Sequence, residues 1–245
     1  MKIAVLATMI LWGAIFLLIA LCFPNFIKAE PVISVRTYYK PGYQAVSLDH
    51  ARAMHRIALR RTEKIFPVRF SHRLEVISPL VAPHEREYVG CYRILSFENG
   101  ACCPNEYIAR HWEQTKAWKR KEVAMFINPP VGANDYYQGR WLSGGIAMRG
   151  CWHWEPNMPI GIVNATEVNF NGESRRRAMI EVYRHELYHA AFNAQHDEKS
   201  FNIMSTFSPQ YNRVEFETAG EIGLVTTEKT IKQAMNCIRQ KRGKK

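Results

Sequence analysis

A long amphipathic helix, expected from about Glu173 to Ala194, is the feature that most constrains how this chain can fold. Its apolar residues recur at helical spacing and occupy one sector of about 120°, which is typical of a helix packed against a core. These residues are Met179, Ile180, Tyr183, Leu187, Ala190, Ala191 and Ala194. The opposite sector is expected to face solvent and contains Arg177, Glu181, Arg184 and Tyr188. One side of the helix is therefore predicted to be buried and the other exposed.

The same helix contains HELYH at residues 185–189, a match to the HExxH motif. On a helix, His185 and His189 are separated by about 40° around the axis, and Glu186 lies about 60° from His189. Both imidazoles can therefore reach one metal ion, with the carboxyl group beside them. These side chains lie at the border of the apolar sector, where an ion can be held rigidly and still be reached by a substrate. An ordinary pair of surface histidines is the alternative.

The N-terminal segment indicates export. Residues 3–23 contain no charged residue, and Pro24 and Lys28 follow this apolar run. The run is longer than the core of an ordinary signal peptide, about 7–15 residues, and near the length of a membrane-spanning helix, about 20 residues. Residues 1–29 are therefore expected to be a signal peptide cleaved after Ala29, or an uncleaved membrane anchor. Either one places residues 30–245 outside the cytosol, because the positive end at Lys2 stays inside.

Charge and cysteine content add two expectations. The chain has 33 Lys and Arg against 22 Asp and Glu, a formal charge of +11, which favours anionic surfaces and specifies no nucleic acid. Five cysteines follow the leader and allow two disulfide bonds and one thiol in an oxidising compartment, in any pairing: Cys91, Cys102, Cys103, Cys151 and Cys237. Buried free thiols are the alternative. No CxxC pair is present, which argues against a zinc site built from cysteine.

Residues 30–245 are expected to form a single domain. Apolar alternation and turn residues predict five strands and two further helices around the long helix. The strands are expected at 31–40, 68–78, 123–128, 146–152 and 160–168, and the helices at about 47–66 and 227–240. Much of the region from 83 to 145 is expected to form long loops.

The run HELYHAAFNAQHDEKSFNIMS resembles the metzincin zinc metalloproteases, whose pattern HExxHxxGxxH is followed by a methionine turn. The resemblance implies an α+β zincin with a mixed twisted sheet, an active-site helix and a C-terminal helix. It also implies that His196 is the third zinc ligand, that Met204 forms the methionine turn, and that the cleft lies near residues 185–204. Asp197, directly after the third histidine, is similar to the adamalysin branch of that family, and the matrixin branch shares the same pattern.

The sequence departs from that pattern at the third histidine. His196 follows His189 by seven residues rather than six, and Phe192 stands where the family has glycine. Glycine permits the positive φ that turns the chain away from the helix, and phenylalanine tolerates it poorly. Asn193 enters this conformation readily and precedes His196 by three residues, the spacing that the family has from its glycine. We therefore expect Asn193 to make the turn. The alternative is a zincin with Glu217 or Glu221 as third ligand.

The implied chemistry is hydrolysis of a protein or peptide substrate. A Zn²⁺ ion held by three neutral imidazoles would keep an open position for water, and Glu186 would act as general base. The segment Ile160–Val168 is expected to be the edge strand to which an extended substrate adds. Tyr211 is a minor candidate for an oxyanion donor, and Thr206 stands where some metzincins have a tyrosine ligand. An exported binding protein with a structural zinc site and no catalysis is the remaining alternative.

Overall fold

The computed structural model divides the chain into two compact units, Met1–Glu30 and Pro31–Lys245, and all the elements below belong to the second. The structure describes the residues 30–41, 45–77, 115–116, 120–128, 136–137, 140–141, 145–153, 159–164, 173–197, 202–205 and 224–243. The apolar N-terminal segment lies outside these residues, so the choice between signal peptide and anchor stays a prediction, as does the boundary at residue 30. None of the helices within the described residues is both long and apolar enough to span a bilayer.

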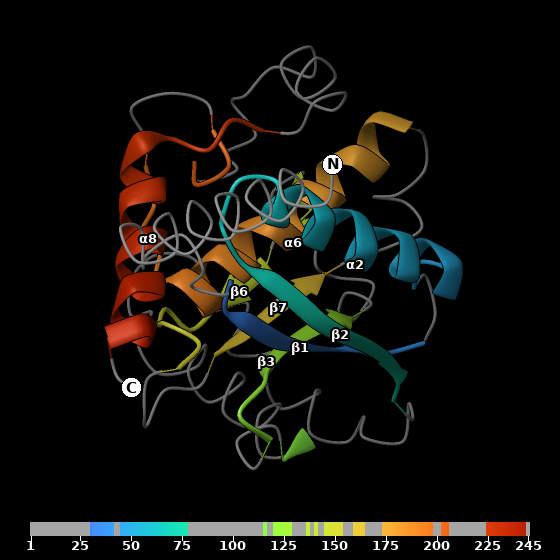
Figure 1. Cartoon of the computed structure of the whole chain (residues 1–245). Coiled ribbons are helices and arrows are strands. Elements are labelled where there is room, and N and C mark those ends of the chain that lie inside the picture. Colours follow the sequence, from blue (N-terminus) through green and yellow to red (C-terminus); the bar gives the residue numbers. More distant parts are fainter. Residues whose placement is uncertain are drawn as a thin grey trace, which may run out of the picture. The chain divides into compact units, whose positions relative to one another are not determined.

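A mixed sheet forms the centre of the second unit (Figure 1). Its strands are arranged in the order β2-β1-β3-β7-β6. The first four in that order run parallel, and β6 pairs antiparallel with β7. The bounds are Val32–Tyr39 for β1, Arg69–Val76 for β2, Val123–Asn128 for β3, Gly145–Ala147 for β6 and Ile160–Asn164 for β7. A separate ladder pairs β4 (Tyr136–Tyr137) with β5 (Arg140–Trp141).

Within the described residues, three helices accompany the sheet: α2 (Leu48–Glu63), α6 (Glu173–Phe192) and α8 (Glu228–Gly243). The first begins where the Ser47 side chain accepts a hydrogen bond from the His50 amide at 3.2 Å, as an N-cap residue does. Both α2 and α6 contact the sheet and each other, and α8 contacts α6. The structure therefore has the predicted mixed sheet, the long helix that contains HELYH and the C-terminal helix.

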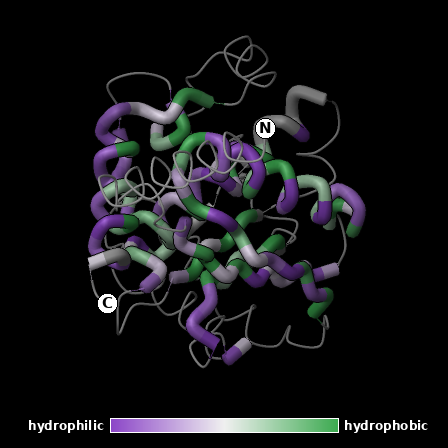
Figure 2. Tube along the Cα trace, in the orientation of Figure 1, coloured by the Kyte–Doolittle hydropathy of each residue, from purple (hydrophilic) through white to green (hydrophobic). Residues whose placement is uncertain are grey.

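The main core lies between the sheet and the helices α2 and α6, where Figure 2 shows hydrophobic residues gathered. Strand residues at alternate positions, such as Val35, Met125 and Val163, face this core. The intervening residues form a second buried cluster on the other face of the sheet: Tyr38, Ala124, Phe126, Ile160 and Ile162. The central strands are thus apolar on both faces, as parallel strands in the middle of a sheet usually are.

This pattern corrects one prediction. The segment Ile160–Val168 was expected to form the edge of the sheet, but β7 lies between β3 and β6. Its buried side chains contribute to both apolar clusters, which is what an interior strand requires. The described sheet ends on this side at the three-residue β6, Gly145–Ala147, and β2 forms its other edge.

A second correction concerns the side of α6 that was expected to face solvent. Glu181 and Arg184 are only 2% and 1% exposed, and Tyr188 is fully buried. Helix α2 covers this side, and its Arg61 forms an ion pair with Glu181. The charged groups are buried because they pair with one another, which reduces the cost of removing them from water.

One disulfide bond joins Cys151, after β6, to Cys237 on α8, with 5.6 Å between the Cα atoms. It is one of the pairings that the five cysteines allow, and it is consistent with an oxidising compartment. The other three cysteines that follow residue 30, Cys91, Cys102 and Cys103, lie outside the described residues.

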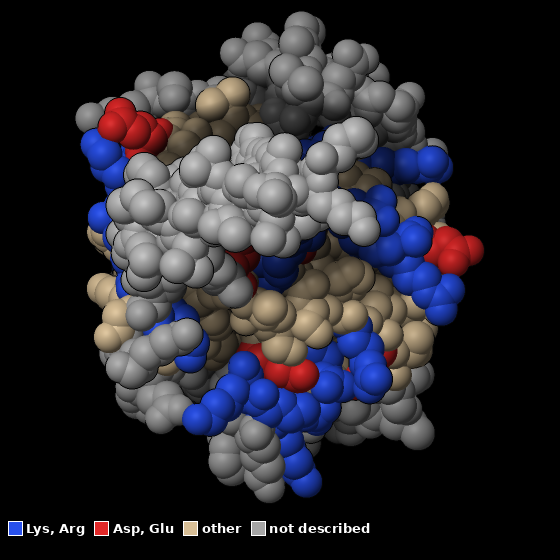
Figure 3. Space-filling view, in the orientation of Figure 1, with Lys and Arg blue, Asp and Glu red and all other residues tan. Residues whose placement is uncertain are grey.

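Positive charge is visible on the face shown in Figure 3, where Lys and Arg side chains gather over α2 and over the lower strands, with Asp and Glu among them. Arg52, Arg56 and Arg60 of α2 are exposed, and Arg52 pairs with Asp49 at 3.2 Å. Attraction of this surface to anionic neighbours stays a prediction.

Candidate metal centre

The C-terminal end of α6 positions the third histidine. Asn193 has φ of 53°, the left-handed conformation predicted for it. Its amide donates to the Gly150 carbonyl at 2.8 Å, and the amides of Gly150 and Trp152 donate to the His189 and Ala191 carbonyls, each at 3.0 Å. The segment before and after Cys151 therefore satisfies carbonyls that a helix end leaves without partners. The chain then turns back along α6 and brings His196 to the two histidines of the motif.

Three imidazoles converge at this place. The Nε2 atoms of His185 and His189 are 3.0 Å apart, and the Nε2 atom of His196 is 3.2 Å and 3.1 Å from them. Three nitrogen ligands of a tetrahedral zinc ion, each at about 2.0–2.1 Å from the metal, stand about 3.3 Å apart. The spacing of the three Nε2 atoms therefore fits one metal ion, and the three residues form a group that could hold it.

Hydrogen bonds at the other ring nitrogens fix the tautomers. His185 Nδ1 donates to the Ile203 carbonyl, and His189 Nδ1 donates to the Ala194 carbonyl, both at 2.7 Å. A carbonyl can only accept, so Nδ1 holds the proton in each ring and Nε2 presents a lone pair. Two lone pairs that face each other at 3.0 Å repel unless a cation lies between them. The hydrogen-bonding pattern therefore fits metal ligation.

Burial keeps both rings neutral, as metal ligation requires. Removal from water, with the nearby His189 ring, lowers the pKa of His185 to about 3. Removal from water likewise lowers the pKa of His189 to about 4. His196 is exposed, so an ion held by the three rings would keep one side accessible to solvent. This is the arrangement of a site with an open coordination position.

Helix α8 supports the loop that contains His196. Lys229 Nζ donates to the His196 carbonyl at 2.8 Å, and the Gln195 amide donates to Gln233 Oε1 at 3.1 Å. Thr227, just before α8, donates to Asp197 Oδ2 at 2.8 Å. Asp197 is thus a structural anchor that joins the third histidine to the start of α8.

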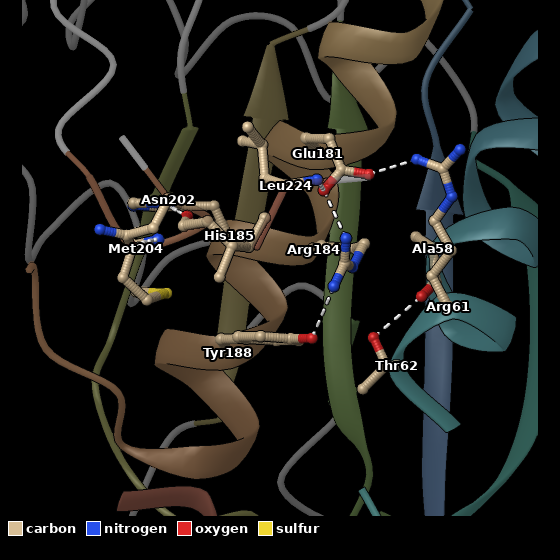
Figure 4. Close-up of polar contacts among 11 residues, drawn as sticks. Ala58, Arg61, Thr62, Glu181, Arg184, His185, Tyr188, Asn202, Met204 and Leu224 are labelled. Atoms are coloured by element: carbon tan, nitrogen blue, oxygen red, sulfur yellow. Dashed lines mark hydrogen bonds and ion pairs between the residues drawn. The ribbon is translucent and has the colours of Figure 1, made fainter. Parts of the chain in front are cut away.

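Met204 lies in a tight, buried turn formed by residues 202–205, beside His185 (Figure 4). Its amide donates to Asn202 Oδ1 at 2.7 Å, and its carbonyl accepts from the Asp197 amide at 3.0 Å. The Asn202 side chain also donates to the Asp197 carbonyl at 2.8 Å. The predicted methionine turn is therefore tied to the residue that follows the third histidine.

Glu186 is 4% exposed on the side of α6 that contacts β7. A Cβ atom added to Gly161 of β7 would lie 3.2 Å from the Cβ of Glu186 and 2.9 Å from the Met125 sulfur. Glycine at 161 therefore allows the helix to approach the sheet closely at this residue. Burial raises the pKa of Glu186 well above its usual value, and a metal cation nearby would favour the charged carboxylate.

The structure thus brings together the predicted ligands His185, His189 and His196, with Met204 nearby and Glu186 next to His185 in α6. The other candidates, Tyr211, Glu217, Glu221 and Thr206, lie outside the described residues. Three supporting groups were not predicted from the sequence: the Ile203 carbonyl, Gly161 and Lys229. The sequence does not show which backbone carbonyl a histidine ring will contact, and nothing in it distinguishes Lys229 from the other basic residues of the C-terminal helix.

Comparison of the chain with protein-family models and with curated protein sequences finds no match in either set.

Proposed function

We propose that this protein is an exported zinc-dependent endopeptidase of the metzincin type. The observation that carries the proposal is the convergence of three imidazole lone pairs within 3.0–3.2 Å, two of them from an HExxH helix. His₃ sites with an open fourth position are typical of catalytic zinc. The bond from Cys151 to Cys237 supports export, because disulfides persist mainly in oxidising compartments.

Zinc is among the metals that this donor set suits. Three neutral imidazoles suit borderline-soft divalent ions, whereas magnesium and calcium prefer oxygen ligands. When bound, the ion would polarise a peptide carbonyl and lower the pKa of a coordinated water to about 7.

The residues of the chain have separate roles in this proposal. His185, His189 and His196 hold the ion, and the backbone partners of His185 and His189 keep Nε2 of each ring free for it. Glu186, the residue after the first ligand, accepts a proton from the attacking water and then donates it to the leaving amine nitrogen. Its buried position, with a raised pKa, suits a group that must both take up and release a proton.

The strand β6 is the proposed position for an extended substrate. It is one of the two edge strands of the described sheet and contacts α6, the helix that contains His185 and His189. The backbone groups on its outer side can pair with a peptide laid beside it. The proposed substrate is therefore a protein or peptide in extended conformation.

The test is digestion of casein or gelatin by the full chain, with metal analysis of the same preparation. We expect about one zinc per chain, hydrolysis that a chelator abolishes, and recovery of hydrolysis when zinc is restored. Stoichiometric zinc without hydrolysis of these or other peptide substrates would instead favour the non-catalytic binding protein with a structural zinc site.

A further inference from the structure

A line of polar contacts begins on the side of α6 that faces α2 (Figure 4). Arg61 of α2 and Arg184 of α6 both donate to the carboxylate of Glu181. The Glu181 Oε2 atom also accepts a hydrogen bond from the Leu224 amide at 3.1 Å. One buried carboxylate therefore binds α2, α6 and the segment before α8 together.

The line continues through the backbone to the first metal ligand. The carbonyl of Val225, directly after Leu224, accepts from the Ile203 amide at 2.9 Å. The carbonyl of Ile203 accepts from His185 Nδ1 at 2.7 Å. Glu181 thus holds the segment Leu224–Val225 in place, and this segment in turn holds Ile203. The Ile203 carbonyl sets the tautomer and ring orientation of His185.

Packing alone gives little reason for this arrangement. Glu181 and Arg184 are 2% and 1% exposed, and a buried ion pair is often no more stabilising than apolar side chains of similar volume. Leucine or methionine at 181 would fill the space, but neither could accept the hydrogen bond of the Leu224 amide. The two arginines hold the carboxylate in place, and Tyr188 accepts from the second of them, Arg184, at 2.9 Å.

We propose that Glu181 is a positioning residue of the metal centre, acting on His185 through Leu224–Val225 and the Ile203 carbonyl. This inference rests on the metal site of the proposed function and adds a remote determinant of its affinity. Partners that orient metal ligands commonly change metal affinity by 10-fold to 100-fold when they are replaced. Glu181 acts through two intervening peptide units, so the lower end of that range is expected.

The test is the effect of Glu181→Gln on metal binding by the full chain, measured with zinc and a chromogenic competing chelator. We expect the zinc dissociation constant to rise about 10-fold. The visible spectrum of the cobalt-substituted protein should change, because the His185 ring shifts in the ligand field. Amide hydrogen exchange at Leu224 and Ile203 should become faster, since both amides belong to the line of contacts.

Glu122→Gln is the matched control. Glu122 accepts from Arg36 at 2.6 Å and 3.0 Å in another partly buried cluster, with no contact to the line described above. The variant Glu122→Gln should lower the melting temperature. Its zinc affinity should stay within about twofold of the wild type, and its cobalt spectrum should be unchanged. If Glu181→Gln does not fold, Arg61→Gln removes only the partly exposed cation and should weaken zinc binding about threefold in the same assay.

Two failures can be told apart. A wild-type chain that binds neither zinc nor cobalt would refute the proposed function, and this inference with it. A wild-type chain that binds both, with a Glu181→Gln or Arg61→Gln variant that melts earlier but keeps wild-type affinity and spectrum, would overturn only the positioning role.

Discussion

Replacing Asn193 by valine tests the turn that returns His196 to the other two histidines. At φ of 53° the residue is in the left-handed region, where an L-residue with a Cβ pays roughly 1–2 kcal/mol and a β-branched residue is a genuine outlier. The neighbouring hydrogen bond from the Asn193 amide to Gly150 would survive, since it uses only the backbone. The strain is therefore the main change.

The strain can be relieved by moving the loop that contains His196, which lies three residues further on. If zinc binding requires the strained turn, the strain of about 1–2 kcal/mol is subtracted from the binding free energy. Zinc affinity should then fall by about 5-fold to 30-fold, because 1.4 kcal/mol is a factor of ten. The melting temperature should fall by about 2–8 °C for a chain of this size. The assays are competition with a chromogenic chelator and thermal unfolding in the same buffer.

Asn193→Gly is the control for this experiment. Glycine adopts positive φ without the steric cost, so zinc affinity should stay within a few-fold and stability should change by less than about 1 kcal/mol. A valine variant that binds zinc as tightly as the wild type, and melts at the same temperature, would refute the role assigned to the turn.

Three further outcomes are expected. Glu186→Gln should keep about one zinc per chain and lower peptide hydrolysis at least about 100-fold, measured by metal analysis and casein digestion, and near-normal hydrolysis would reject the general-base role. Reducing the bond between Cys151 and Cys237, whose separation is 86 residues, should cost about 2–4 kcal/mol in thermal unfolding, and an unchanged melt with the thiols shown to be free would contradict it. Burial, with nearby His72 and Arg56, lowers the pKa of His55 to about 3 in the folded protein. The unfolded chain therefore takes up a proton at His55 at a higher pH than the folded protein does, and the free energy of unfolding should fall as pH drops from about 6.5 toward 3, by up to about 1.4 kcal/mol per pH unit. His55→Gln should reduce that slope in chelator-treated protein, and an equal slope would exclude His55 as its cause.

The sequence was most informative where one local pattern decides the geometry. The spacing of HELYH sets the directions of its side chains on any α-helix, and the conformational preferences of asparagine predicted the turn at Asn193. The strand at Val123–Asn128 was predicted with the bounds that it has, because a short apolar run rich in strand-forming residues is typical of a buried strand.

It was least informative where the answer depends on what lies against an element. A helical wheel gives the direction of Glu181 and Arg184, but not that Arg61 of another helix pairs with one of them. A strand was expected at 146–152, which overlaps β6, but the sequence did not show that this strand pairs with β7 and so places β7 inside the sheet. The partner of Cys151 is 86 residues away, and spacing alone could not select it.

The most direct test of the metal centre is X-ray absorption at the zinc edge of the metal-loaded full chain, with His196→Ala beside it. We expect three imidazole nitrogens and one further light atom at about 2.0–2.1 Å in the wild type, and loss of one imidazole or of the metal in the variant. A sulfur ligand at about 2.3 Å, or an unchanged spectrum after His196 is replaced, would contradict the three-histidine site.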